Sequence, residues 1–425
     1  MSIKNYLIEL IEPDLREFAK HEKAIRALLP DRKEHRVSFD LIDVDVSMAN
    51  AFRRTAIEEV DMKALTFDPT TIDTNADYIL YDEFLDRIQI IPIKQDIPDD
   101  LVMSINVFNA SNDNGIMTIY SDSITGGERY IPGRFRIAEL RPGNRLKVPK
   151  ITIMRGFGRK NACFSLTSDY TYRNLDYMDV HVINYKGNRI DKRVKTNEVA
   201  KLAGVKPAEA WGKKILVFPN AHYEGIISDH VKEKIALAKY DIILKNKKSP
   251  VDDNEYIAEQ SSSVAVSREF RMSFYLAGQI NPDKFVEIIC KNIIDRLTAV
   301  KTGIESIYHI KGGGKKLIEP ITLGLDTTGK LDLRIKPVII KHSDESATLD
   351  MWNLSIKGET HTLGELIVNH IFAEDPNVPY VTPAMSHLRD DQTTIQLLHP
   401  EPEKITLNAI KNCITIFTNL IKQAS

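Results

Sequence analysis

The residues that could carry chemistry occur in short, incomplete motifs. The segment Gly312-Gly313-Gly314-Lys315-Lys316 is similar to the end of a phosphate-binding loop, but Lys316 stands where Ser or Thr would bind magnesium. A flexible basic linker is therefore the simpler interpretation, with nucleotide binding as the alternative. Gly156-Phe157-Gly158 is an isolated Gly-x-Gly, and Asn161 stands where a dinucleotide site needs its third glycine. We expect no dinucleotide site there.

Residues that could ligate a metal are scattered. Cys163, Cys290 and Cys413 lie far apart, so no pair has the spacing of zinc ligands, and so few thiols argue against a disulfide-rich secreted protein. Asp43 and Asp45 lie two apart in a predicted strand, where they would share one face. They could hold a metal, but no acidic cluster supports a two-metal centre. We expect no metal and no cofactor.

Nucleophilic catalysis also lacks a sequence signature. The eleven histidines are scattered, and no nucleophile elbow or Cys/His motif is present. His361 precedes a predicted helix, where a capping or partner contact fits better than catalysis. A catalytic triad needs no sequence neighbours, so the pattern leaves that possibility open. A protein without catalytic activity of its own is the preferred interpretation.

Composition indicates a folded protein of two to three domains. The chain has 425 residues, of which 43% are hydrophobic and 27% charged, so it is neither a disordered chain nor a coiled-coil rod. Its formal charge of -2 leaves only local basic patches for nucleic acid. One such patch is 186–214, which is either a solvated face or a contact with nucleic acid or an acidic partner. Neither a signal peptide nor a membrane span is predicted, so we expect a soluble protein of a reducing compartment.

The first part of the chain predicts helices and a strand. Residues 3–29 have the pattern of one or two amphipathic helices, and residues 37–46 alternate as a strand. With Ser47 as N-cap, residues 48–60 form a predicted helix with one apolar face. A second helix is predicted over 82–88. The apolar face of the first helix consists of Met48, Phe52, Ala56 and Val60.

Residues 97–266 predict a mostly β insert. Short alternating segments, at 104–108, 116–120 and 146–154, are separated by turn residues. A strand then returns at 269–277, and Asn281 is positioned to cap the helix that follows. Residues 303–345 have the composition of a connector.

The last part repeats this order of elements. A strand over 352–356 leads into a helix at which Thr362 and Glu365 fit a capping box. Strands around 378–381 and 394–398 and a helix over 403–422 follow. Two copies of one strand–helix–strands–helix unit suggest an intramolecular pseudo-dimer, because each closing helix has an apolar face to bury. The expected seam consists of Val286, Cys290, Ile293 and Leu297 on one helix and Ile410, Cys413, Ile414, Phe417 and Ile421 on the other.

Several motifs resemble the α-like assembly subunits of multisubunit RNA polymerases. Ala49-Asn50-Ala51-Phe52-Arg53-Arg54, with Glu58-Glu59-Val60, resembles the family's first helix, and residues 81–93 resemble its second helix and Ile-Pro exit. Residues 140–143 and 155–165 are similar to its insert domain, and 269–298 to the return to the dimerisation domain.

The tail is similar to the partner subunit. His361-Thr362-Leu363-Gly364-Glu365-Leu366 resembles the signature of the small eleventh subunit of eukaryotic polymerase II, and 375–380 and the last helix follow in order. Fusion of a third-largest and an eleventh subunit resembles the arrangement in large cytoplasmic DNA viruses of eukaryotes. The insert has only Cys163, so the resemblance implies that the metal site of some relatives is absent. Asp86, Gln89, Asn161 and Glu365 also depart from the family's usual residues.

The resemblance implies an α+β fold and an assembly function. The expected domains are an N-terminal helical extension (1–35), a split dimerisation domain (36–96 and 267–302), the insert (97–266), the connector (303–345) and a second dimerisation domain (346–425). In the family such subunits do no chemistry and dock the two largest subunits, alongside small assembly subunits. A location in the host cytoplasm, at the viral factory, and in the virion is implied, with no membrane contact and DNA at most indirectly contacted.

The resemblance also implies partner-binding residues. Arg53 and Arg54 cannot both point inward, and Arg suits bidentate pairing with a carboxylate at an interface, although solvated helix arginines are the alternative. A stand-alone nucleic-acid-binding scaffold that uses 186–214 is the competing function. The implied partner-binding residues are Asn50, Arg53, Arg54, Glu83, Arg87, His361, Thr362 and Glu365.

Overall fold

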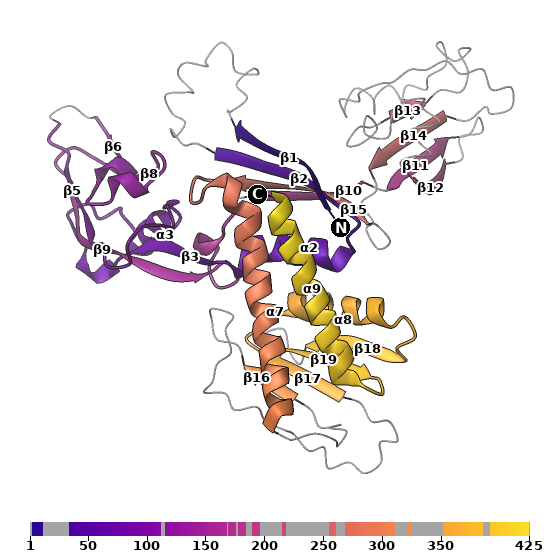
Figure 1. Cartoon of the computed structure of the whole chain (residues 1–425). Coiled ribbons are helices and arrows are strands. Elements are labelled where there is room, and N and C mark those ends of the chain that lie inside the picture. The colour runs from indigo at the N-terminus through magenta and orange to yellow at the C-terminus, as the bar shows by residue number, and fades with distance from the viewer. Residues whose placement is uncertain are drawn as a thin grey trace. The chain divides into compact units, whose positions relative to one another are not determined.

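The computed structural model contains both helices and sheets (Figure 1), which confirms the mixed composition expected of an α+β fold. Its contacts divide the chain into two compact units. The first comprises Met1–Asn5, Phe39–Ala49 and Thr171–Ser273, and the second comprises Tyr6–Ser38, Asn50–Tyr170 and Phe274–Ser425. The structure describes residues 2–11, 34–111, 115–167, 169–175, 177–183, 189–195, 215–217, 255–260, 268–310, 321–324, 352–385 and 392–424.

The first unit contains an antiparallel sheet with the strand order β12-β11-β14-β13. Strand β11 (Tyr177–Ile183) pairs with β12 (Arg189–Lys195) on one side and with β14 (Glu255–Gln260) on the other. Strand β13 (Ile215–Val217) completes the sheet at β14. Strands therefore occur within the predicted β insert, and β12 is the described part of the basic stretch 186–214.

A second sheet has the strand order β1-β2-β15-β10 and corrects one prediction. Residues 3–29 were expected to be helical, but β1 is a strand over Ser2–Ile11, and residues 12–33 lie outside the described part. Within β1 the exposed Leu7 lies between the less exposed Tyr6 and Ile8. Alternation every two residues is typical of a strand. The predicted helix was wrong because pairing within a sheet overrides local helix propensity. The other strands are β2 (Glu34–Ile42), β15 (Glu269–Leu276) and β10 (Asp169–Asn174).

Helix α2 (Val46–Arg54) starts at a different cap from the predicted one. Strand β2 ends at Ile42, and the Asp45 carboxylate accepts hydrogen bonds from the backbone N of Ser47 (2.8 Å) and Met48 (3.1 Å). Asp45 is therefore the cap, because its side chain satisfies the free N–H groups of the first turn. Asp43, with φ of 58°, pairs with Arg268 at 2.9 Å instead of sharing a strand face with Asp45. The prediction that Ser47 is the cap was therefore wrong, and so was the prediction that Asp43 and Asp45 share one face of a strand.

The helix continues beyond Arg54 as one π-helical turn, η2 (Thr55–Glu59). The predicted apolar face is confirmed, since Met48, Phe52, Ala56 and Val60 are all buried. The Phe52 ring contacts the rings of Phe274 and Phe285, with centroids 6.1 and 6.4 Å away. A π-helical turn shifts the following side chains relative to an ordinary helix and is frequent at functional sites.

The second unit contains a β-rich part around helix α3 (Tyr81–Gln89). The sequence predicts that this helix buries Phe84, Leu85 and Ile88, and the structure buries Phe84 and Ile88 but leaves Leu85 partly exposed. One sheet has the order β3-β9-β5-β7 with β4 paired to β9, and β6 pairs with β8. The strands predicted at 104–108, 116–120 and 146–154 are all present. Their bounds, with those of the neighbouring strands, are β3 (Asp61–Thr66), β4 (Asp73–Thr74), β5 (Met103–Phe108), β6 (Met117–Tyr120), β7 (Ile124–Thr125), β8 (Arg136–Leu140) and β9 (Arg145–Phe157).

The C-terminal part combines a four-stranded sheet with helices α8 (His361–Glu374) and α9 (Pro402–Ala424). The order is β16-β17-β19-β18, with β16 parallel to β17 and the other pairs antiparallel. Helix α8 contacts β18, β19 and α9. The strand predicted at 378–381 starts later, at Tyr380. The strands are β16 (Ile321–Gly324), β17 (Trp352–Lys357), β18 (Tyr380–Met385) and β19 (Gln392–Leu398).

The start of helix α8 and the end of helix α7 also differ from the predictions. The α8 cap is Thr360, whose hydroxyl accepts from the backbone N of Thr362, so the predicted capping box of Thr362 with Glu365 was wrong. Helix α7 runs over Phe285–Ile310, and therefore the first eight residues of the predicted connector are helical. Asn281 caps the short 3-10 turn that leads into α7.

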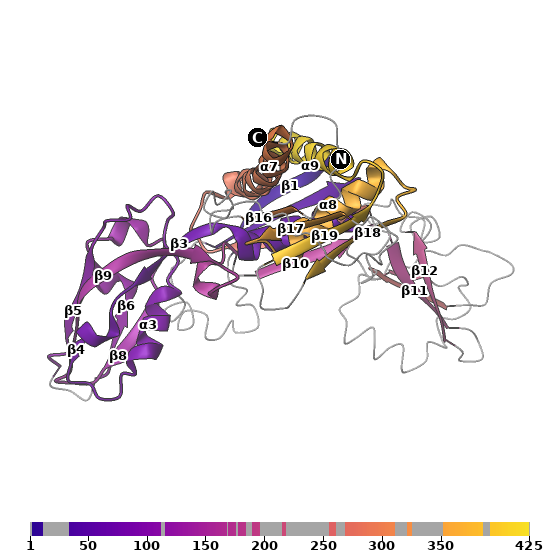
Figure 2. The same ribbon diagram turned by 90° about the horizontal axis from the view of Figure 1, so that it is seen from below.

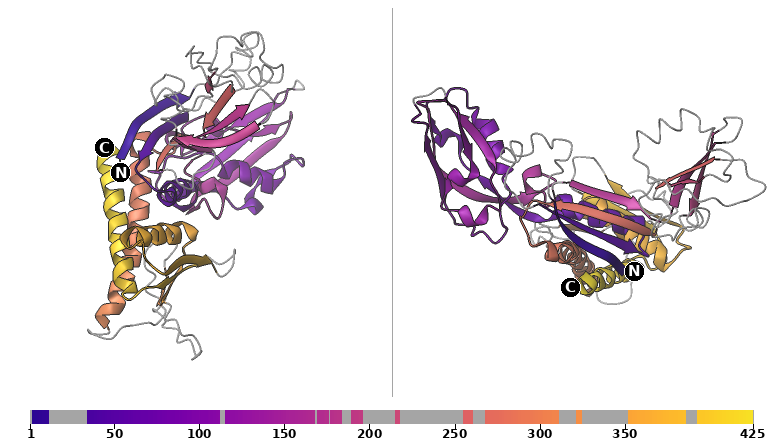
Figure 3. Two further views of the ribbon diagram at one scale, coloured as in Figure 1. Left: turned by 90° about the vertical axis from the view of Figure 1, so that its right-hand side faces the viewer. Right: turned by 90° about the horizontal axis from the view of Figure 1, so that it is seen from above.

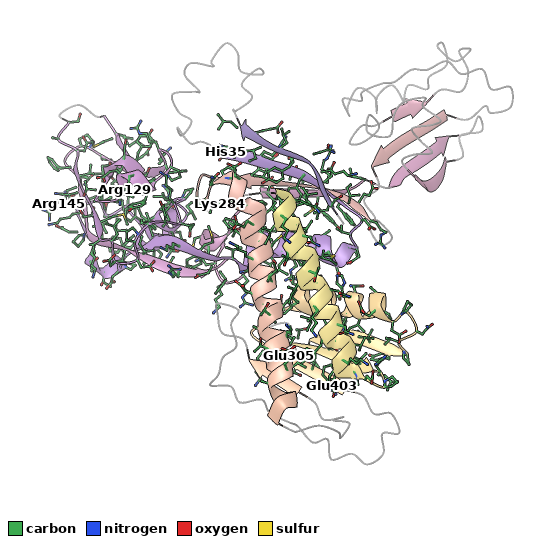
Figure 4. All side chains as sticks on the ribbon, viewed as in Figure 1. His35, Arg129, Arg145, Lys284, Glu305 and Glu403 are labelled. Atoms are coloured by element: carbon green, nitrogen blue, oxygen red, sulfur yellow. The ribbon has the colours of Figure 1, made fainter. Side chains whose placement is uncertain are left out.

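Helices α7 and α9 lie side by side and run antiparallel (Figures 1 and 3). Glu305, late in α7, and Glu403, early in α9, lie at the same end of the pair (Figure 4). Seen along the pair, both helices lie on one side of the C-terminal sheet (Figure 2). Most of the expected seam side chains are buried, while Ile414 and Ile421 are partly exposed. Among the described helices, none is long and apolar enough to cross a membrane.

Candidate functional site

The Arg53 side chain is held in a fixed position on α2. The Oδ1 atom of Asn50 accepts hydrogen bonds from Nε (3.1 Å) and Nη2 (2.8 Å) of Arg53. The guanidinium also lies 5.1 Å from the centre of the Tyr170 ring and donates to its hydroxyl at 3.0 Å. The structure thus brings together Asn50 and Arg53, and it adds Tyr170, which sequence reasoning missed.

Arg54 and Arg87 each pair within their own helix. Arg54 pairs with Glu58 at 2.8 Å, and Arg87 pairs with Glu83 at 2.6 Å, both four residues apart. Arg87 also donates to the carbonyl of Ile137 and lines two cavities, of about 210 and 340 Å³, next to α3. The Arg87–Glu83 pair is exposed, and the Arg54–Glu58 pair is half-buried. Ion pairs with this spacing on a helix surface contribute well under 1 kcal/mol in general, so these charges are able to exchange partners.

The expected residues on α8 do not form one exposed surface. Thr362 is buried, His361 is partly buried, and Glu365 is exposed. Among the described residues, no hydrogen bond or ion pair joins the expected side chains of α2, α3 and α8 to one another. Within the described ranges, no group of three or more His, Cys, Asp or Glu residues could hold a metal ion.

The strongest charged site is one that the sequence did not single out, a cluster of Glu59, Arg159, Arg296 and Glu359. Arg296 Nη1 lies 2.9 and 3.0 Å from the two carboxylate oxygens of Glu359, and its Nη2 lies 2.9 Å from Glu59 Oε2. Arg159 Nη1 lies 3.7 Å from the same Glu59 oxygen. The side chains of Glu59 and Glu359 are each 1% exposed, that of Arg296 is 5% and that of Arg159 is 10%. We call these four residues the buried charge cluster.

The local backbone explains how Glu59 and Arg159 reach this cluster. Glu59 ends the π-helical turn, and its carbonyl accepts from Asn292 Nδ2 at 2.9 Å. The backbone N of Arg159 donates to the Glu58 carbonyl, and a Cβ at Gly158 would overlap the carbonyl oxygen of Ile57. Only glycine permits this close approach. Gly158 of the isolated Gly-x-Gly therefore serves to pack the Arg159 backbone against the π-helical turn.

The Glu359 side of the cluster lies in the turn between β17 and α8. Gly358 has φ of 85°, a left-handed conformation that favours glycine, and its carbonyl accepts from Arg159 Nη1 at 3.3 Å. The Thr360 hydroxyl, besides capping α8, lies 3.5 Å from Glu59 Oε1. The turn that starts α8 therefore also brings Glu359 to the other residues of the cluster, which lie far from it in the sequence.

Burial and charge oppose each other at Glu359. Burial raises the pKa of its carboxyl to about 7, although the positive charges of Arg296 and Arg159 act to lower it. Burial alone would lower the pKa of Arg296, but attraction to Glu359 and Glu59 raises it above its ordinary value. The cluster has no solvent-exposed reacting atom, so the arrangement fits a structural link better than acid–base catalysis.

The cysteine thiols are not activated. Cys290 and Cys413 are fully buried, and burial raises the pKa of Cys163 to about 11. A nucleophilic cysteine needs the opposite shift, because the thiolate is the reactive form. The Gly312–Lys316 segment and most of 186–214 lie outside the described residues.

Comparisons with known proteins confirm the resemblance to viral third-and-eleventh-subunit fusions. The chain is 28% identical over 185 residues to the "DNA-directed RNA polymerase RPB3-11 homolog" of African swine fever virus (isolate Tick/South Africa/Pretoriuskop Pr4/1996). It is 27% identical over 185 residues to the homologues of isolate Warthog/Namibia/Wart80/1980 and strain Badajoz 1971 Vero-adapted. Each alignment covers 41% of this chain and 50% of the relative, so the chain spans about half the length of the curated relatives it matches. No protein-family model matches.

Proposed function

We propose that this chain is a non-catalytic assembly platform of a viral DNA-dependent RNA polymerase. The similarity to RPB3-11 homologues carries the proposal. The packing of α7 against α9 supports it, because it joins a helix that ends at Ile310 to one that begins at Pro402. The inert thiols and the inaccessible cluster also fit a subunit that does no chemistry.

The platform would consist of two α-like halves paired within one chain. The first half comprises 36–96 and 267–302, with 97–266 as its insert, and the second half comprises 346–425. Each half ends in a long helix, α7 or α9, with an apolar face. Pairing these faces buries both, and the connector raises the effective concentration of one half near the other.

The platform would dock the two largest polymerase subunits and small assembly subunits. Arg53 is the strongest candidate contact, because Asn50 and Tyr170 already hold its guanidinium in one position. A pre-organised guanidinium loses less conformational entropy when it binds a carboxylate. Arg54 and the Glu83–Arg87 pair are further candidates. DNA contact would be indirect, and no cofactor is needed. The subunit would be located in the host cytoplasm, at the viral factory, and in the virion.

Co-purification of the large subunits tests the proposal. The change is Arg53→Glu together with Arg54→Glu, made in the tagged full chain in cells that contain the cognate polymerase. We expect the wild-type chain to bring down two very large subunits and the variant to lose at least about ten-fold of the second-largest one. Charge reversal removes the carboxylate contact and adds repulsion.

Arg145→Glu is the matched control, because Arg145 is exposed and, among the described residues, its guanidinium forms an exposed ion pair with Asp73 in the β-rich part. It should leave recovery of the large subunits unchanged. Circular dichroism should show that both variants remain folded. Normal recovery of the second-largest subunit with the double variant would contradict the assigned docking site.

A further inference from the structure

The buried charge cluster is asymmetric with respect to the two ends of the chain. Glu59, Arg159 and Arg296 precede residue 311, and together they bring one positive charge in excess. Glu359 follows residue 351 and brings the compensating negative charge. Once Glu359 is ionised, the cluster is neutral only when both parts of the chain contribute to it.

Incomplete versions of this cluster are unfavourable. An ion that is desolvated without its partner costs several kcal/mol in general, and breaking a buried pair is strongly destabilising. In the complete cluster the carboxylate and guanidinium side chains are at most 10% exposed. A wrong partner that covered the site equally well would therefore also keep out the water that could replace the missing charge. A pairing that leaves Glu359 out buries an excess positive charge, and one that supplies only Glu359 buries an excess negative charge.

The apolar seam by itself gives little selection between the two halves. The buried residues of α7 and α9 are similar in kind, and each helix has one fully buried cysteine, Cys290 on α7 and Cys413 on α9. Apolar contacts are not directional, so two similar faces accept one another in several combinations. A charged group that must find its partner is the usual way to exclude the wrong combinations.

We propose that the buried charge cluster determines which halves pair. It stabilises a first half paired with a second half and destabilises a pair of two like halves. This inference rests on the proposed pairing of two α-like halves and deepens it. Two first halves would bury two sets of excess positive charge, and two second halves would bury two Glu359 carboxylates that each lack Arg296. This selection acts during folding, when the first half of one chain meets another chain before its own second half is in place.

Refolding of the full chain tests this selection. A mixture of isotopically light and heavy chains is refolded from urea at pH 8, and lysine cross-links between chains are identified by mass spectrometry. The variant is Arg296→Met with Glu359→Met, which removes one charge of each sign and leaves Glu59 with Arg159. Well-packed apolar residues in place of a buried ion pair are often tolerated. Lys291 on α7 is exposed and reports on contacts between two α7 helices.

We expect wild-type chains to give almost no α7–α7 cross-links between chains and the variant to give at least ten-fold more. Lys301→Met with Glu305→Met is the control, because this pair lies on the partly exposed side of α7. It should behave like the wild type. Arg296→Gln with Glu359→Gln removes the same two charges with hydrogen-bonding side chains, and it replaces the methionine variant if that variant does not fold.

Two results would overturn the proposal. One is a wild-type chain that forms α7–α7 contacts as readily as the variants. The other is a folded neutral variant that refolds with as few like-half contacts as the wild type, since shape or the connector would then be sufficient. Either result leaves recovery of the large polymerase subunits by the wild-type chain unaffected, so the proposed assembly function is tested separately.

Discussion

At the scale of single residues, Glu359 combines a side chain that is 1% exposed with a close charged partner. Its carboxylate has an arginine at 2.9 Å, yet burial still raises its pKa to about 7. The reason is that desolvation of a carboxylate can exceed the attraction of a single guanidinium. The charge state of this residue should therefore depend on pH near neutrality.

Glu359→Gln tests that dependence through the free energy of unfolding. The ordinary pKa of the carboxyl is 4.5, so the unfolded chain loses this proton well before the folded chain, which keeps it until about pH 7. The folded state then binds more protons in this window, and its stability falls as pH rises. We expect the stability of the wild type relative to the variant to fall by a few kcal/mol, on the order of the pKa difference, between pH 4.5 and 7.

Urea unfolding at several pH values measures this difference. Glu365→Gln is the control, because Glu365 is an exposed carboxyl on the helix that follows. This substitution at an exposed position should change the free energy of unfolding by less than about 0.5 kcal/mol. A difference for Glu359→Gln that stays constant between pH 4.5 and about 7 would show that the Glu359 carboxyl titrates alike in the folded and unfolded chains.

Gly158 is a second residue whose role is set by its surroundings. Alanine at this position places a Cβ against the Ile57 carbonyl, and backbone atoms cannot move aside as a flexible side chain can. We expect Gly158→Ala to destabilise the chain by about 1–3 kcal/mol or more, which is typical of overpacking. Thermal unfolding measures it, with Lys160→Ala at the exposed neighbouring position as control. Equal melting temperatures for the two variants would rule out the close approach.

At the scale of elements, the pairing of α7 with α9 should provide much of the stability of the C-terminal part. Leu297 is fully buried on α7, and therefore Leu297→Ala should leave a cavity and lower the free energy of unfolding by about 2–5 kcal/mol. Lys291→Ala, on the exposed side of the same helix, should change it by less than about 0.5 kcal/mol. Chemical denaturation of both variants measures this. A small effect of Leu297→Ala would mean that α7 is not packed here in solution.

At the scale of the whole molecule, the internal pairing of α7 and α9 predicts the oligomeric state. An apolar helix face that is already covered within the chain is not available to a second copy. We therefore expect the purified chain to sediment as a monomer at micromolar concentration. Sedimentation velocity over a range of concentrations measures this, and a stable folded homodimer would count against pairing within one chain.

Local patterns predicted most of the elements that surround the site. The alternation in β15 and the four-residue spacing of Met48, Phe52 and Ala56 each identify one buried face, because periodicity follows directly from strand and helix geometry. Caps were less predictable. Asp45 and Thr360 cap helices for which Ser47 and Thr362 had been favoured, since neighbouring polar residues compete and backbone dihedrals decide between them.

The sequence by itself determined the α+β pattern, the two long apolar helix faces and the motifs that resemble α-like polymerase subunits, since each depends on residues close together in the chain. Only the tertiary structure decided that β1 is a strand and that Arg296 meets Glu59 and Glu359. These outcomes depend on pairing across long sequence distances. A buried ion pair exists only where packing removes water from both charges at once, and no local pattern reports that.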